Sequence, residues 1–433
     1  MNNPRELALR SLIKSDTQEC FSNIEIGTTL ARADLGKSDA ALYTLLYLGV
    51  LEKRMYLDKA IEEYSSISID KIDIETKNAL RLGLYQLIFT DRIPDYSAVD
   101  SSVELAPKKS KGFVNAVLRS FLRGNKRVAL PSDSWEKASI QGSLPSELMT
   151  VFSESYGKDI AIQLAMYENK DFALSLRVNT LLTSVGEIFE ALTERGQAPT
   201  ISKYASDIIK CSVSIAEIKD LIDTGRVFIQ DESSRICSLA LGAMPNERVG
   251  DMCACPGGKT FSMAIDMENT GEIKASDLHK NKLGLIEKGA KRLGIDIISA
   301  RVQNAKEYVA EYDKYFDRVL CDVPCSGLGV IYKKPEIKYK SVENIRALPQ
   351  IQYDILKNCS QYVKVGGYLV YSTCTLNKLE NEENVLCFLA ENDSFEPVDF
   401  TVGDASSKGG MYTFFPYITG TDGFFIAKLR RVK

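Results

Sequence analysis

Residues 248–260 read RVGDMCACPGGKT, and this short run indicates how the second half of the chain folds. An apolar strand leads into a loop that contains two adjacent glycines, Gly257 and Gly258, and a helix follows. Adjacent glycines let the backbone turn tightly and approach a ligand, and the amino end of a helix favours anionic groups. The loop has neither the spacing of a dinucleotide-binding G-x-G-x-x-G motif nor that of a Walker loop. A different kind of ligand site is therefore expected where the strand ends.

Asp277 lies about twenty residues beyond this loop, at the end of the next expected strand. A carboxylate in that position can accept hydrogen bonds from ribose hydroxyls. The loop and the carboxylate together indicate a cofactor that contains adenosine. The alternative is an ordinary glycine turn followed by a surface aspartate.

Strands and helices alternate on both sides of this loop. Strands are expected at 248–253, 272–277, 297–302, 316–322 and 368–375, with helices between them, for example at 281–293 and 342–362. Such alternation predicts a doubly wound, mostly parallel sheet of the Rossmann-like α/β class. In these sheets ligands bind beyond the carboxyl ends of the strands, near the point where the strand order reverses.

The first 125 residues are predicted to be helical. Ser38 or Asp39 can cap a helix with apolar residues from Leu42 to Val50, a second helix covers 80–89, and a third carries Val114 to Leu122. Seven basic residues and no acidic one lie between Pro107 and Arg127, namely Lys108, Lys109, Lys111, Arg119, Arg123, Lys126 and Arg127. A local basic face can bind phosphates even on a protein whose net charge is −4.

Between these two parts the pattern is mixed. Residues 129–135 resemble a linker, helical patterns are expected at 147–168, and short strands are expected at 173–178 and 227–229. The chain is therefore divided into a helical domain at 1–128, a linker with a small α/β module at 129–232, and a larger α/β domain at 233–433.

Composition narrows the class of protein. The charged amino terminus is not a secretory signal, and no apolar run is long enough to cross a membrane, so a cytoplasmic protein is expected. The ten cysteines include no C-x-x-C pair and the only histidine is His279, which argues against a disulfide framework and against a metal site. Proton transfers are therefore expected to use carboxylates, lysine or thiols.

Two cysteines follow the ends of two different expected strands. Cys325 stands in Asp322-Val323-Pro324-Cys325-Ser326-Gly327, and Cys374 stands in Tyr371-Ser372-Thr373-Cys374-Thr375. A single cysteine in such a place is more often a core residue than a catalytic one. Because parallel strands end on the same rim, we expect the two thiols to lie together, and this favours a chemical role.

These motifs resemble the Nop/Sun family of RNA cytosine-C5 methyltransferases, in the branch that acts on bacterial small-subunit ribosomal RNA. The front helices, with Phe113-Val114-Asn115-Ala116-Val117-Leu118-Arg119, resemble the NusB-like RNA-binding domain of that branch. The resemblance covers nearly the whole chain, and the matching elements are 230–234, 253–260, 322–327, 334–338, 371–374 and 422–425.

The resemblance implies a covalent mechanism. Carbon 5 of cytosine is too weak a nucleophile to attack a sulfonium methyl group directly, so a thiolate first adds to carbon 6 and makes an enamine. By resemblance Cys374 is this thiolate, Cys325 assists breakdown of the adduct, and Asp322 contacts the cytosine or the methyl-donor region. The base must leave its stack to be reached. The substrate is expected to be RNA, 16S ribosomal RNA in particular, and the protein is expected to be a monomer without a membrane partner.

The resemblance also implies S-adenosylmethionine as cofactor. Its methionine and adenosine are expected against Cys253, Ala254, Cys255, Pro256, Gly257, Gly258 and Lys259, with further contacts from Asp277, Asn304 and Asp322. Asn304 departs from the family, which usually has an aspartate there, so the affinity for the cofactor is in question. Cys255, where alanine is usual, and Gly250, where an apolar residue is usual, are milder departures.

Several alternatives stay open at the level of sequence. The same chemistry on transfer RNA is one, and a catalytically silent RNA-binding or assembly factor with the same fold is another. The basic turn with Lys333, Lys334 and Lys338 either contacts RNA phosphate or is merely solvated. Asp422-Gly423 is interpreted first as a hairpin turn.

Overall fold

The computed structural model describes residues 3–18, 20–168 and 173–433. The chain forms two compact units, one comprising residues 1–168 with 331–342 and the other comprising 169–330 with 343–433. Residues 1–2 of the amino terminus and residues 169–172 of the predicted small module lie outside the described residues. The division into three parts after residues 128 and 232 stays a prediction.

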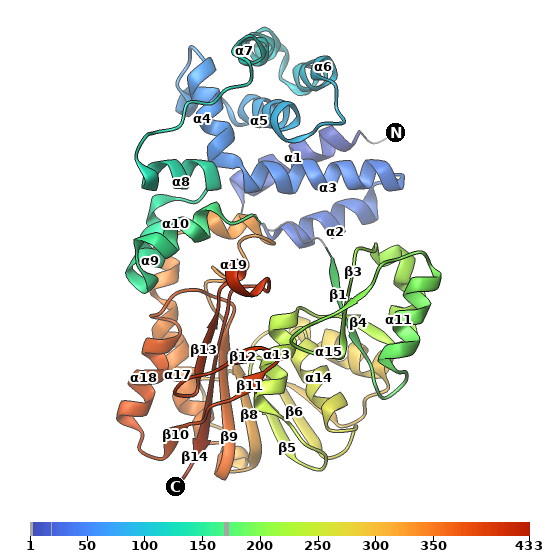
Figure 1. Cartoon of the computed structure of the whole chain (residues 1–433), viewed down its shortest axis with the longest axis vertical. Coiled ribbons are helices and arrows are strands. Elements are labelled where there is room, and N and C mark those ends of the chain that lie inside the picture. The colour runs from blue at the N-terminus through green and yellow to red at the C-terminus, as the bar shows by residue number, and fades with distance from the viewer. Residues whose placement is uncertain (1–2, 19, 169–172) are drawn as a thin grey trace. The chain divides into compact units, whose positions relative to one another are not determined.

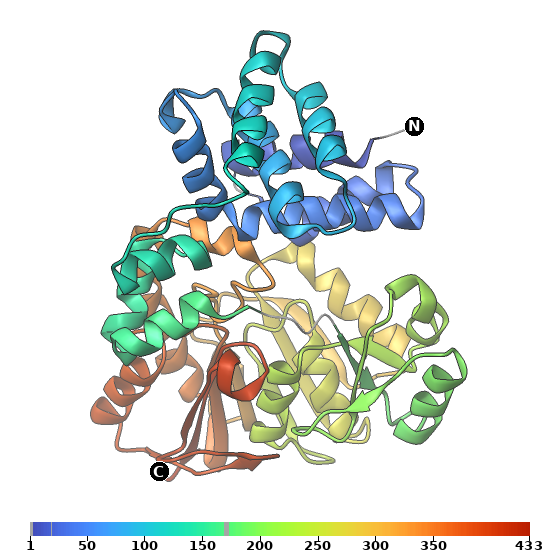
Figure 2. The ribbon, with the colours of Figure 1, turned by 45° about the horizontal axis from the view of Figure 1, so that its top comes forward.

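The first unit is helical, as the sequence predicts (Figure 2, blue to green). Helix α5 is its centre, because most of its side chains are buried and it packs against α1, α3, α4, α6 and α7. The helices are α1 Pro4–Thr17, α2 Ser22–Arg32, α3 Lys37–Glu52, α4 Arg54–Tyr64, α5 Ile74–Phe89, α6 Asp95–Leu105, α7 Lys111–Arg123, α8 Ser134–Gly142, α9 Ser146–Tyr156 and α10 Lys158–Met166.

Two details of these helices differ from the prediction. Helix α3 has its N-cap at Gly36, two or three residues before the predicted caps at Ser38 and Asp39, because the first helical turn already includes those side chains. The helical patterns predicted at 147–168 form two helices, α9 and α10. Gly157 separates them with a φ of +95°, a conformation that no helix interior accepts.

A segment from the second half of the sequence completes the helical unit. The 3₁₀ turn Pro335–Tyr339 packs there, and Lys338 donates hydrogen bonds from Nζ to the carbonyl oxygens of Glu52 (3.3 Å) and Gly142 (3.1 Å). Lys338 is only 4% exposed, so both interpretations of this lysine from sequence, a phosphate contact and a solvated turn, are wrong. Burial lowers the pKa of Lys338 to about 8, and the two carbonyl groups offset part of the cost of burying its charge.

The second unit contains the predicted doubly wound sheet. Strand order is β10-β14-β9-β8-β5-β6-β7, with β13 beside β14, and Figure 1 shows the central strands in this order. Neighbours from β7 to β9 are parallel, whereas β14 runs antiparallel to β9. The strands are β5 Arg248–Asp251, β6 Glu272–Asp277, β7 Ile298–Val302, β8 Phe316–Asp322, β9 Val363–Thr373, β10 Phe395–Pro397, β13 Met411–Phe414 and β14 Phe424–Arg431.

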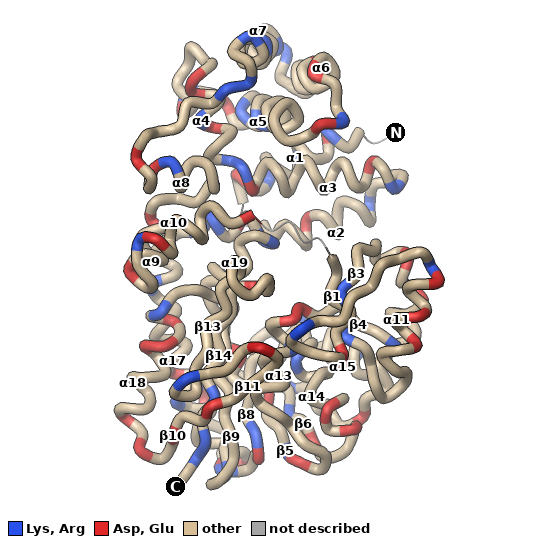
Figure 3. Tube along the Cα trace, viewed as in Figure 1, with Lys and Arg blue, Asp and Glu red and all other residues tan. Residues whose placement is uncertain are grey.

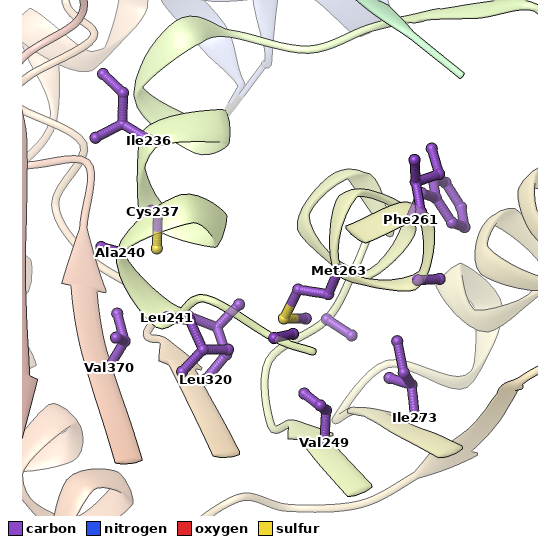
Figure 4. Packing of buried hydrophobic residues seen from close by; sticks show 14 of the residues in the cluster. Ile236, Cys237, Ala240, Leu241, Val249, Phe261, Met263, Ile273, Leu320 and Val370 are labelled. Atoms are coloured by element: carbon purple, nitrogen blue, oxygen red, sulfur yellow. The ribbon is translucent and has the colours of Figure 1, made fainter. Parts of the chain in front are cut away.

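Helices cover both faces of this sheet. One core forms under α13, α14 and α15, and Figure 4 shows part of it, with Val249, Ile273 and Leu320 from three strands. The opposite core, under α17 and α18, receives Val319 and Cys321, the neighbours of Leu320 in β8. Alternate residues of one strand thus enter different cores, as the pleat requires. The helices are α13 Glu232–Leu241, α14 Gly258–Asp266, α15 Lys280–Leu293, α16 Val342–Arg346, α17 Leu348–Ser360, α18 Glu382–Glu391 and α19 Pro416–Thr419.

The helix predicted at 342–362 is interrupted. Helix α16 ends at Arg346 and α17 begins at Leu348, with Pro349 in its first turn. Proline has no backbone N–H and disfavours a helical residue before it, so it begins a new helix instead of continuing the old one.

A small antiparallel sheet precedes the large one in sequence. Its order is β2-β3-β1-β4, with helices α11 Val185–Glu194 and α12 Lys219–Asp223, as expected of a small α/β module. The strands are β1 Leu174–Val178, β2 Thr200–Ile201, β3 Ile208–Cys211 and β4 Val227–Ile229, and a separate two-stranded ribbon consists of β11 Thr401–Val402 and β12 Ala405–Ser406. Strand β4 runs directly into residues 230–234 and α13.

The order of the large sheet reverses at β5, which has β6 on one side and β8 on the other. The chain leaves the carboxyl ends of these strands in opposite directions, which opens a crevice between them. The loops after β5 and β8 are therefore where a ligand is expected. Within the described residues, no helix has the length and apolar character needed to cross a membrane.

Candidate active site

The loop after β5 is shaped by its glycines. Gly257 has a φ of +109°, and α14 begins at the next residue. A Cβ atom on Gly257 would lie 2.6 Å from Phe261 Cζ, so a larger residue would not fit without movement. The Ala254 N–H donates to Ser276 O (2.9 Å), which fixes the loop to the end of β6. The amino end of α14 consequently opens toward the crevice beside β5.

An open pocket occupies this crevice. Both predicted loops contribute to it, the first through most of its residues and the second through Asp322. The lining residues are Ile229, Gln230, Asp231, Ser234, Asp251, Cys253, Ala254, Cys255, Pro256, Gly258, Lys259 and Asp322. Six of the seven predicted loop residues line it; Gly257 does not, because its role is to turn the backbone.

One wall of the pocket has no counterpart in the predicted site. Residues 229–234, between β4 and α13, supply it. Gln230 holds this wall to the loop, because its Nε2 donates to Gly258 O (3.0 Å) and its Oε1 accepts from Ser262 Oγ (2.7 Å). The sequence carried a signal, a polar run between a strand and a helix just ahead of the glycine loop, but no contact with a cofactor was predicted for it.

Asp277 and Asn304 end the neighbouring strands and do not line the pocket. The Asp277 carboxylate accepts from the N–H of Cys255 (Oδ2, 3.2 Å) and from the N–H of His279 (Oδ1, 2.9 Å). The Asn304 amide is engaged in its own turn, donating to Glu307 Oε1 (2.8 Å) and accepting from Lys306 N–H (3.1 Å). Asp277 is therefore tied to the cofactor loop, whereas Asn304 is not.

Asp322 connects the pocket to the strand that carries Cys374. Its Oδ2 pairs with Lys259 Nζ (2.7 Å), and its Oδ1 accepts from Ser372 Oγ (2.8 Å). Burial would lower the pKa of Lys259, but Asp322 outweighs it, and the pKa lies above the usual value. Lys259 also lies over the Phe424 ring, 5.4 Å from its centroid. The charged lysine thus has a fixed place at the edge of the pocket.

Asp251 is a buried carboxyl that the predicted site lacks. It is 1% exposed, lines the pocket, and accepts a hydrogen bond from Thr260 Oγ1 (2.7 Å). In the described part of the chain its Oδ1 is buried without a hydrogen-bond partner. Burial raises the pKa of Asp251 to about 7. A polar ligand group in the pocket would satisfy this oxygen.

The two predicted cysteines lie together. Asp322 of β8 is opposite Ser372 of β9, so the parallel register brings the following loops to the same rim. The Sγ atoms of Cys325 and Cys374 are 3.2 Å apart, and both residues are partly exposed. The hydrogen bond with Cys374, and then burial, raises the pKa of Cys325 well above its usual value. The pair therefore holds a thiol proton that either sulfur can donate to the other.

The other thiols near the pocket are unsuited to nucleophilic attack. Burial, and then the neighbouring carboxylate Asp277, raises the pKa of Cys255 to about 12. Burial also raises the pKa of Cys253 well above its usual value. Thiols react as thiolates, so these two residues are groups that shape the pocket.

The segment Asp422-Gly423 supports the cysteine loops and is not a hairpin turn. Helix α19 lies between β13 and β14, so these two residues only lead into β14. Gly423 N–H donates to Gly329 O (2.9 Å), and Gly329 N–H donates to Cys374 O (3.0 Å). A Cβ on Gly329 would lie 1.9 Å from Gly423 O, so both glycines are needed for this close approach. The interpretation as a hairpin was wrong because the relevant contact is distant in sequence.

The basic residues predicted at 107–127 lie on and around α7 (Figure 3). Lys126 pairs with Asp95 (2.6 Å), and Arg119 bonds to Asn115 within the helix (2.9 Å). The exposed members of the set are Lys108, Lys109, Arg119, Arg123, Lys126 and Arg127. They form a cationic surface of the helical unit.

Comparison with known proteins agrees with this geometry. A family model described as 16S rRNA methyltransferase RsmB/F matches residues 238–430, and the NusB family model matches residues 2–123. The probable ribosomal RNA small subunit methyltransferase B of Bacillus subtilis is 33% identical, and the alignment covers 99% of this chain and 98% of the relative. The protein of the same description from Synechocystis is 32% identical over the full length of both chains.

A solved structure supports the same fold. A methyltransferase homologue from Pyrococcus horikoshii is 28% identical and superposes with a TM-score of 0.61, covering 70% of this chain and all of that one. The family matches confirm both resemblances indicated by the sequence, the carboxyl-terminal methyltransferase and the amino-terminal NusB-like domain.

Proposed function

The chain belongs to the RsmB/F family of 16S rRNA methyltransferases, and we propose that it methylates carbon 5 of a cytosine in small-subunit ribosomal RNA through a covalent adduct with Cys374. It is an S-adenosylmethionine-dependent RNA methyltransferase, as its family is. The observation that carries the finer proposal is the pair of thiols 3.2 Å apart, in the loops that follow the neighbouring strands β8 and β9, where Asp322 at the end of β8 lines the pocket.

The geometry fits a division of labour between the two cysteines. Cys374 is the nucleophile that adds to carbon 6 of the cytosine, and Cys325 is the neighbouring thiol that serves the later release. Addition at carbon 6 turns the ring into an enamine whose carbon 5 is nucleophilic. After methylation, the carbon 5 proton passes to water acting as the base, and departure of the Cys374 thiolate restores the aromatic ring. S-Adenosylmethionine supplies the electrophilic methyl group when bound.

The residues around the pocket fit this cofactor. The backbone from Cys253 to Lys259 provides the cradle, and the unpartnered Asp251 oxygen can accept from a polar ligand group. Asp277 would hold the ribose, since each of its oxygens accepts one N–H from the residues that the structure describes. Asp322 would face both the methyl-donor region and the base. Asn304 would contribute less, because its amide is bonded within its own turn.

The helical unit supports RNA docking. We assign the phosphate contacts to the cationic surface on and around α7, because exposed arginine and lysine side chains release counterions when they meet phosphates. The division into residues 1–128, 129–232 and 233–433 is part of this proposal, as are a monomeric state and action in the cytoplasm, where ribosomal RNA is made in bacteria.

The test is a methylation assay with the full-length protein. Unmodified 16S ribosomal RNA and, separately, unmodified transfer RNA are incubated with methyl-labelled S-adenosylmethionine, and 5-methylcytosine is mapped. Label at one cytosine of the ribosomal RNA alone is the expected result. Label only in transfer RNA would move the same chemistry to that substrate. Binding of the cofactor and RNA without any label would indicate a silent assembly factor.

A further inference from the structure

A buried carboxylate lies behind the cysteine pair and has no part in the mechanism above. Glu380 is fully buried and precedes α18. Its Oε1 accepts from Ser326 Oγ (2.6 Å) and Asn377 Nδ2 (3.0 Å), and its Oε2 accepts from Ser326 N–H (2.9 Å) and Gln352 Nε2 (2.8 Å). All four donors are neutral. A carboxylate in such a place is costly to bury, so its contacts define a demanding geometry.

These contacts hold both sides of Cys325. Ser326, the residue after Cys325, gives Glu380 both its backbone N–H and its hydroxyl. Gln352, which donates to Glu380, uses the same Nε2 to donate to Pro324 O (2.9 Å), the residue before Cys325. Hydrogen bonds therefore fix the residues on both sides of Cys325, Pro324 and Ser326, while Cys325 itself stays partly exposed.

Asn381, the residue after Glu380, holds the two neighbours of Cys374 in the same way. Asn381 accepts from Thr373 Oγ1 (2.5 Å) and donates from Nδ2 to Thr375 O (3.0 Å), and both threonines are fully buried. Tyr371 of β9 adds a hydrogen bond from its hydroxyl to Glu380 O (2.5 Å). Two consecutive side chains therefore fix the residues that flank the two cysteines, one cysteine each.

One hydrogen bond joins the two loops directly. Ser326 Oγ and Thr375 Oγ1, the hydroxyls of the residues after Cys325 and Cys374, are 2.6 Å apart. We propose that Glu380 and Asn381 are positioning residues that set the separation of the two thiols, so that the nucleophile and the group that serves release address the same base. The expected effect on methylation rests on the proposed function, whereas the expected effect on the separation of the two thiols does not.

Glu380→Gln tests the clamp with little change in shape. An amide presents N–H groups on one of its two ends. In one orientation the Ser326 N–H and Gln352 Nε2 lose their acceptor; in the other Asn377 Nδ2 loses it, and the Ser326 hydroxyl must turn from donating to accepting. Thr375→Val is the second variant: it removes only the hydroxyl that joins the loops and leaves the carboxylate with its four donors. Glu382→Gln is the matched control, because Glu382 lies two residues on and accepts from Thr413 Oγ1 (2.7 Å) on β13.

The first measurement needs no RNA. Diamide takes two electrons from a close thiol pair, accepts the two protons on its nitrogens and becomes the hydrazine, and leaves a Cys325–Cys374 disulfide. The rate of this oxidation in the full-length protein, followed by mass spectrometry of alkylated peptides, reports how often the thiols meet. We expect Glu380→Gln and Thr375→Val to slow it on the order of tenfold, and Glu382→Gln to leave it unchanged.

The second measurement is single-turnover methylation of 16S ribosomal RNA. The clamp variants should lose on the order of 10- to 100-fold in the chemical step, while the Kd for S-adenosylmethionine and the KM for RNA stay as in the unmodified protein. Unchanged disulfide rates in both clamp variants would overturn the proposal. Slower disulfide formation in a protein that methylates no RNA at all would uphold the clamp and refute the proposed function instead.

Discussion

Asp277→Ala is expected to weaken binding of S-adenosylmethionine by about tenfold to 150-fold. The Asp277 carboxylate accepts one N–H on each oxygen, at 3.2 Å from Cys255 and 2.9 Å from His279. A carboxylate oxygen can accept two hydrogen bonds, so each keeps one site for a ribose hydroxyl. Loss of a hydrogen bond to a charged group costs about 1.5–3 kcal/mol, and every 1.4 kcal/mol is about tenfold in Kd.

Asp277→Asn should have a Kd for S-adenosylmethionine between those of the unmodified protein and Asp277→Ala. The amide oxygen can still accept from Cys255 or from His279, but the amide nitrogen cannot accept from the other, and the charge is lost. Half of the loop anchor and part of the ribose contact would therefore remain. The two variants separate the loss of charge from the loss of shape.

Isothermal titration of the full-length protein with S-adenosylmethionine measures both effects. Asp296→Ala is the control, because Asp296 is an exposed carboxylate just before β7, and the cofactor loop follows the opposite, carboxyl ends of the parallel strands. A Kd for Asp277→Ala within about twofold of the unmodified protein, with the control also unchanged, would refute the assignment of the ribose to Asp277. The expected rise in Kd, about tenfold to 150-fold, does not overlap with a change of about twofold.

Three further predictions address the thiols, the charged helix and the buried acid. Cys374→Ala should give neither adduct nor product, whereas Cys325→Ala should attack, methylate and stall as a covalent complex that survives denaturing electrophoresis; the reverse pattern would exchange the roles. Glutamine at four exposed positions near α7 should make the salt dependence of RNA binding shallower by roughly three, at about 0.7–0.9 per phosphate contact, and an unchanged slope in binding titrations would assign this surface to another partner; the positions are Lys108, Lys109, Arg119 and Arg123. Asp251 has a folded pKa of about 7 against an ordinary 3.8, so the folded protein holds an extra proton between these values and loses stability as pH rises through them. Urea unfolding at about pH 5 and about pH 8 should therefore show the stability of Asp251→Asn relative to the unmodified protein rising by roughly 2.6 kcal/mol between the two pH values, and an equal difference at both would contradict it.

Much of the large sheet could be predicted because its signals are local. Strands β6 and β8 have the bounds that their apolar runs predict, Glu272–Asp277 and Phe316–Asp322. The meeting of Cys325 and Cys374 follows from the same logic, since parallel neighbours end on one rim and each cysteine follows such an end. Periodicity and connection order sufficed for these features.

Two breaks in helices were predictable in principle and were missed. Pro349 marks the start of α17 by a purely local rule, and Gly157 separates α9 from α10 in the same way. A predicted helix that contains such a residue should be divided there. No tertiary information was needed for either correction.

The remaining misses depend on contacts between distant parts of the sequence. Lys338 can be buried because the carbonyl oxygens of Glu52 and Gly142 accept hydrogen bonds from its ammonium group. Asp422-Gly423 has the local signature of a turn, but Gly423 is required by its approach to Gly329. Glu380 closely precedes two further acidic residues, Glu382 and Glu383 in the first turn of α18, and nothing near it in sequence indicates Ser326 as its partner.

The arrangement around Asp322 explains why the distant contacts concentrate at this site. Asp322 receives Lys259 from the cofactor loop and Ser372 from the strand that leads to Cys374, and it precedes Cys325 by three residues. One carboxylate therefore touches the methyl-donor side and both thiol-bearing loops. Attack at carbon 6 and methylation at carbon 5 involve adjacent atoms of one ring, so an error of about 1 Å between the thiol and the methyl group would cost on the order of 100-fold in rate. Loops without such contacts would not hold the thiol and the methyl group to within about 1 Å. Buried hydrogen bonds to the ends of β5, β8 and β9 hold these loops in place.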